Sequence, residues 1–86
     1  MDYEDKVRRK LKEILSGKIA PNKMPGSTTE CAALALILGH PPGLTSLSRL
    51  DCWGYLRDQD VVFVKQLCDE YHYEIRDWEA TAKVDG

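Results

Sequence analysis

The sequence lacks the features of a membrane protein and of a disulfide-bonded secreted protein. Its longest apolar run, at residues 31–38, is far shorter than the roughly 20 residues that cross a bilayer. Three cysteines cannot all pair within one chain, which favours free thiols in a reducing compartment. The N-terminus is charged and has no apolar run of the kind that a signal peptide needs. We therefore expect a cytoplasmic protein that has no membrane partner.

Signs of catalysis or of a bound metal are also scarce. No pair of carboxylates lies in an apolar setting, and neither a glycine-rich phosphate loop nor a Ser-His-Asp order is present. Cys68 and His72 have a spacing that metal ligands can use, but a structural zinc site normally has two tight ligand pairs. Cys31, Cys52 and Cys68 have apolar neighbours, where thiols pack as small hydrophobes. We expect no enzymatic activity, no cofactor and no small-molecule substrate.

Positive charge is concentrated at one end of the chain. The net charge is −2. Residues 1–23 contain seven Lys/Arg and four Asp/Glu, whereas residues 24–86 contain five and ten. A nucleic-acid-binding protein usually has a basic face. Only the N-terminal segment offers one here.

The length of 86 residues predicts a single domain, residues 1–86. We divide it into an N-terminal helix at 1–17, a loop at 18–26, a helix-turn-helix core at 27–78, and a wing strand and tail at 79–86. The first helix is amphipathic, with apolar residues at helical spacing. Ser27 and Glu30 form a capping box before a helix at 28–38, whose apolar character on all sides predicts a buried centre.

The middle of the chain predicts two more helices. A third helix begins at Thr45 or Ser46 and ends at a turn on Gly54, where the absence of a β-carbon permits a sharp change of direction. Asp58 is the expected N-cap of a fourth helix at 59–70. Its apolar spacing, continued to Tyr71, indicates that Val61, Val64, Leu67, Cys68 and Tyr71 are buried.

The pattern of residues 71–84 predicts β-strands. Tyr71, Tyr73 and Ile75 alternate with polar residues, and 79–84 could return as a second strand. We therefore predict a mainly α fold with a small C-terminal β-hairpin.

Residues 27–75 resemble the small winged helix-turn-helix proteins common in phages and prophages. The matching pieces are Leu44-Thr45-Ser46-Leu47, Trp53-Gly54, the series Val61/Val64/Leu67, and Tyr73-Glu74-Ile75. The resemblance covers just over half of the chain and consists mostly of hydrophobic pattern. It implies a winged helix-turn-helix domain, here with an extra N-terminal helix, and a DNA-binding regulator that acts as a dimer.

In the DNA-binding hypothesis, the fourth helix enters the major groove. Gln59 and Gln66 could then pair with adenine edges and Lys65 with guanine. Arg49, Arg57 and Arg76 could hold phosphates together with Arg9 and Lys10 of the first helix. Acidic residues on the fourth helix would place like charge beside the duplex, which counts against this hypothesis.

The alternative hypothesis is a protein-binding module, either an adaptor or an inhibitor that occupies a host nucleoprotein through its acidic surface. The helical pattern places Val62 and Phe63 opposite the buried side of the fourth helix. Exposed apolar residues on a helix suggest a protein contact or a dimer interface. The two hypotheses share the outer side of the fourth helix as their contact surface.

Overall fold

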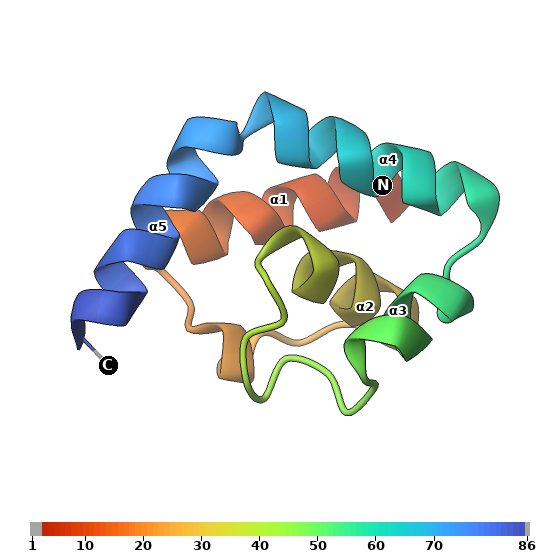
Figure 1. The fold of residues 1–86 in the computed structure, drawn as a ribbon, viewed down its shortest axis with the longest axis horizontal. Helices are drawn as coiled ribbons and strands as arrows, with labels where there is room; N and C mark the ends of the chain where they lie inside the picture. The colour runs from red at the N-terminus through yellow and green to blue at the C-terminus, as the bar shows by residue number, and fades with distance from the viewer. Residues whose placement is uncertain (1–2, 86) are drawn as a thin grey trace.

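Five α-helices and one 3₁₀ turn make up the fold in the computed structural model, which describes the backbone of residues 3–85 and the side chains of residues 3–81. In chain order they are α1 (Tyr3–Leu15), η1 (Pro21–Lys23), α2 (Thr28–Ile37), α3 (Arg49–Tyr55), α4 (Asp58–Glu70) and α5 (His72–Asp85). α2 lies at the centre and packs against α1, α3 and α4 (Figure 1). α5 packs against α4 and α1 at one end of the molecule.

α2 begins at the predicted cap. The Ser27 hydroxyl oxygen accepts a hydrogen bond from the Glu30 backbone N–H at 3.2 Å, and the hydroxyl donates to the Glu30 carboxylate at 3.1 Å. The residues from Glu30 to Ala35 are all buried, as expected for a helix with apolar residues on every side. After α2, Gly39 and His40 both have positive φ, which ends the helix. The prediction of a central buried helix is confirmed.

α1 and α4 lie side by side over α2 (Figure 1). Val7, Leu11 and Ile14 are fully buried, which confirms the predicted apolar stripe of the first helix. The rings of Tyr3 and Phe63 are 6.4 Å apart, and Arg8 pairs with Glu70 further along both helices. Tyr3 precedes Arg8 on α1, and Phe63 precedes Glu70 on α4. The two helices therefore run in the same direction.

The turn between α3 and α4 falls later than predicted. α3 starts at Arg49 rather than at Thr45 or Ser46, because the Ser48 hydroxyl oxygen caps the Asp51 N–H at 3.1 Å. The helix continues through Gly54 to Tyr55, and the chain turns at Leu56 and Arg57.

The cap of α4 also differs from the prediction. Asp58 is the first helical residue, and the Asp60 carboxylate accepts from the Arg57 N–H at 3.3 Å. The predictions of a turn on Gly54 and of Asp58 as N-cap were wrong.

The predicted hairpin and the winged fold were also wrong, because the segment from His72 to Asp85 is helix and residues 3–85 contain no strand. Tyr73 is exposed while Ile75 is buried, so these two residues do not share a face as they would in a strand. Tyr71, Ile75 and Trp78 lie instead at the spacing of a helical stripe and pack against the core. A strand at this position would have no second strand to pair with among the described residues.

Candidate protein-binding surfaces

Phe63 is not the surface residue that the sequence predicted. Its side chain is 3% exposed and lies between α4 and α1, with Arg8 stacked 6.0 Å from the ring centre. Its neighbour Val62 is 56% exposed, as predicted. The pattern of α4 alone could not reveal that α1 covers this side of the helix, so the prediction of Phe63 as a contact residue is corrected.

Lys10 is also withdrawn from the predicted contact surface. Its Nζ lies 2.5 Å from Glu30 Oε1, and the two side chains are 12% and 11% exposed. Burial opposes ionisation of Glu30, but hydrogen bonds from Lys10 and Ser27 outweigh it, so the pKa of Glu30 lies below its usual value. Lys10 therefore joins α1 to α2 and is not available to a phosphate group.

The remaining predicted DNA-binding residues are exposed, but they do not converge. Gln59, Lys65 and Gln66 all lie on α4, where Asp58, Asp69 and Glu70 are exposed as well. The arginines stand on separate elements, with Arg9 on α1, Arg49 on α3, Arg57 before α4, and Arg76 on α5. α3 and α5 lie at opposite ends of the molecule (Figure 1).

The thiols and carboxylates form no reactive cluster in the described part of the chain. Burial raises the pKa of the Cys31, Cys52 and Cys68 thiols, which leaves little thiolate at neutral pH. No three His, Cys, Asp or Glu side chains among residues 3–81 come close enough together to hold a metal ion. Cys31 and Cys52 belong to the core, where they pack as small apolar groups.

An apolar surface covers the outer side of α3. We call it the α3 patch; it consists of Leu47, Leu50, Trp53, Gly54 and Tyr55, and Asp51 is its one charged lining residue. Leu50 is 79% exposed, Tyr55 is exposed, and Trp53 and Leu47 are half-buried. Cys52 and Leu56, the residue that follows the helix, are buried and define the inner side of α3. Leu50 points away from that side.

Gly54 lies within the α3 patch, and the fold gives no reason for a glycine there. Its φ is not positive, and a β-carbon built on it would meet nothing within 4 Å. A glycine inside a helix costs about 1 kcal/mol relative to alanine. The missing side chain leaves a shallow hollow between exposed apolar neighbours, into which a partner could pack closely.

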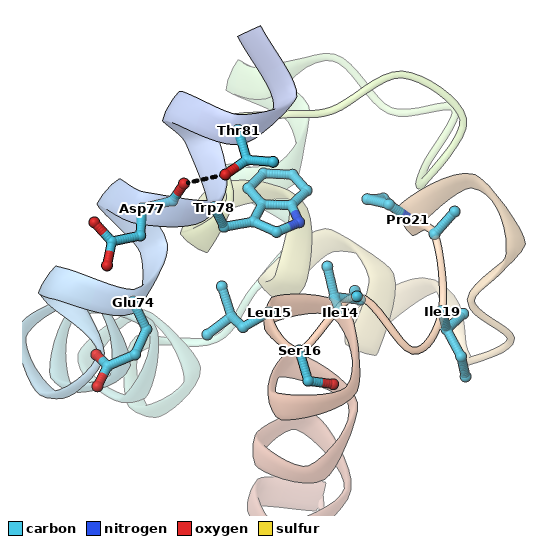
Figure 2. A pocket seen from close by; sticks show the side chains of 11 residues that line it. Ile14, Leu15, Ser16, Ile19, Pro21, Glu74, Asp77, Trp78 and Thr81 are labelled. Atoms are coloured by element: carbon cyan, nitrogen blue, oxygen red, sulfur yellow. Dashed lines mark hydrogen bonds between the residues drawn. The ribbon is translucent and has the colours of Figure 1, made fainter. Parts of the chain in front are cut away.

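A second hollow lies between the end of α1 and α5. We call it the α5 groove. Figure 2 shows Trp78 projecting from α5 toward Pro21, with Ile14 and Leu15 of α1 beside it. Glu74 and Asp77 form the outer edge along α5. The groove has a volume of 620 Å³, within the roughly 300–1,000 Å³ range of ligand pockets.

Sequence reasoning missed both surfaces. The sequence analysis placed the contact surface on the fourth helix, whereas the third helix buries Cys52, with Leu56 after it, and leaves Leu50 exposed. Cys52 and Leu56 are four residues apart, which is the spacing of one helix face. This spacing in the sequence could have identified the buried side of α3. The α5 groove could not be predicted, because the segment that contains Glu74 and Asp77 was expected to form a β-hairpin rather than a helix.

Comparisons with protein-family models, with curated proteins and with solved structures found no match. None of the helices in the described residues combines the length and the apolar character needed to span a membrane. A functional proposal must therefore rest on the surfaces described above.

Proposed function

We propose that this protein is a non-enzymatic protein-binding module and that the α3 patch is its contact surface. The observation that carries the proposal is the 79% exposure of Leu50 beside an otherwise unexplained glycine, Gly54. Contiguous exposed apolar residues on a small protein often mark an interaction site. Tryptophan and tyrosine, both present in the patch, are enriched at the energetic centres of protein interfaces.

The composition of the patch favours an apolar protein partner over a nucleic acid. Asp51 lines the patch and Arg49 lies beside it on α3, and both are exposed, so the mainly apolar surface has charges of both signs at or near it. A phosphate backbone would require several basic groups on one face. The arginines that were predicted to hold phosphates, Arg9, Arg49, Arg57 and Arg76, stand on separate elements, and DNA binding stays a prediction that receives less support.

The test is affinity capture from a lysate of the source organism, with and without nuclease. Leu50→Asp should abolish capture of the partner, because a carboxylate cannot enter an apolar interface without losing its hydration. It should change the free energy of unfolding by less than about 0.5 kcal/mol, since Leu50 is exposed and an acid is favoured in the first turn of a helix. Val62→Asp is the matched control, because it adds the same charge to an exposed apolar site on α4.

Gly54→Ala separates binding from stability. Alanine should raise the free energy of unfolding by about 0.4–1 kcal/mol, because the position is helical and has room for a β-carbon. The same substitution should weaken capture if a partner packs into the hollow. The proposal would be contradicted if the Leu50→Asp variant still captured the partner. It would also be contradicted if nuclease treatment removed the captured partner, and that outcome would favour DNA binding.

A further inference from the structure

The α5 groove combines an apolar floor with an edge of one charge sign. Its floor includes Ile14, Leu15 and Trp78, and its charged lining residues are Glu74 and Asp77. Among residues 3–81, whose side chains the structure describes, no lysine or arginine lines it. Lys18 lies in the loop beside the groove but is exposed and not part of the lining. The groove therefore favours a ligand that is both apolar and cationic.

Two further features add to the negative potential of the groove. α1 ends at Leu15, a lining residue, and the C-terminus of a helix carries a partial negative charge. Trp78 also lines a second hollow of 480 Å³ beside Leu38 and Pro41, whose charged lining residue is Glu79. The indole is thus accessible from two hollows and has acidic residues in both. An aromatic face next to carboxylates is a favourable site for a lysine or arginine side chain.

Arg76 is the one lysine or arginine of α5 whose side chain the structure describes, and it does not line the α5 groove. Arg76 lines a smaller hollow together with Cys68, His72 and Glu79, away from Glu74 and Asp77 of the α5 groove lining. Asp77 accepts a hydrogen bond from the Thr81 hydroxyl only through its backbone oxygen, at 3.0 Å (Figure 2). None of the ion pairs identified in the described residues uses the carboxylates of Glu74 and Asp77.

We propose that the α5 groove binds a segment of another protein that carries a lysine or arginine next to apolar residues. The aliphatic stem of the basic side chain lies on Trp78 and Leu15, and its charged head reaches Glu74 and Asp77. Neighbouring apolar side chains of the segment fill the floor over Ile14. This site is separate from the α3 patch, since α3 and α5 lie at opposite ends of the molecule (Figure 1), so either proposal can fail without the other.

Each surface contains one of the two tryptophans of the chain, which provides a site-specific probe. In the Trp53→Phe variant, whose helical content is first checked by circular dichroism, all tryptophan fluorescence comes from Trp78. This variant is titrated with a short synthetic peptide of leucine, alanine and lysine, and with a counterpart in which glutamate replaces each lysine. We expect a saturable change in Trp78 fluorescence with the lysine peptide only, weakening as salt increases.

Charge variants test the edge of the groove. Glu74→Gln with Asp77→Asn should raise the Kd for the lysine peptide roughly tenfold, as expected for the loss of two exposed ion pairs. Asp58→Asn with Asp69→Asn changes the net charge equally on α4 and should leave the Kd unchanged. Equal binding of both peptides, no saturable change, or an equal loss in the α4 control would overturn the proposal.

Discussion

Phe63→Asp should unfold the protein, whereas Val62→Asp one residue earlier should leave it folded. Phe63 is 3% exposed and packs between α4 and α1, while Val62 is 56% exposed. Removing a buried phenylalanine costs roughly 3–5 kcal/mol, and an unpaired buried carboxylate adds to that loss. A domain of 86 residues has a total stability of only about 4–13 kcal/mol at the usual value per residue.

Urea unfolding followed by circular dichroism at 222 nm would measure both variants. Val62→Asp should keep the wild-type midpoint within error, because exposed substitutions usually change stability by less than about 0.5 kcal/mol. A folded Phe63→Asp protein with a midpoint near that of wild type would mean that α1 does not cover α4 in solution. Two adjacent sites that receive the same charge make the comparison independent of net charge.

Lys10→Met should destabilise the protein by roughly 3 kcal/mol, because it leaves the Glu30 carboxylate nearly buried and without its cation. Adding Glu30→Gln should restore most of that stability. Glutamine has no charge to bury and can still accept from the Ser27 hydroxyl, as the capping-box pattern allows. A double-mutant cycle measured by urea unfolding gives the coupling between the two residues. A Lys10→Met protein as stable as wild type would contradict this account.

The same pair predicts how stability depends on pH. The pKa of Glu30 is lower in the folded protein than its ordinary value of 4.5. The stability that this carboxylate contributes is therefore fully present above about pH 4.5 and is lost as the pH falls through the lowered pKa. Below pH 4.5, wild type should lose stability more steeply than the Lys10→Met/Glu30→Gln protein. Parallel curves would show that other carboxylates dominate acid unfolding.

The sequence predicted the helices that carry strong local signals. Val7, Leu11 and Ile14 follow one helical stripe, and Ser27 with Glu30 marks the start of α2, so neither prediction depended on the rest of the fold. α5 has a weak apolar period because it buries few side chains. Its short alternation of aromatic and polar residues was therefore mistaken for a strand.

The candidate sites depended on tertiary contacts that local pattern does not contain. Phe63 is buried only because α1 packs beside α4, and Lys10 is engaged only because α2 brings Glu30 to it. Leu50 is exposed because Cys52 and Leu56 define the inner side of α3. The α5 groove requires α1 and α5, which are more than 50 residues apart in the chain, to meet. In each case the missing information was which helix lies next to which.

The contacts of α1 with α4 and α5 bear on how the chain can fold during synthesis. α1 is made before α4 and α5, yet both of these later helices pack on it. Until they emerge, the nascent chain presents Val7, Leu11 and Ile14 with only α2 available to shield them. Translation must therefore pass α5 before these helices can all pack together, and until then the nascent chain is a candidate for chaperone binding.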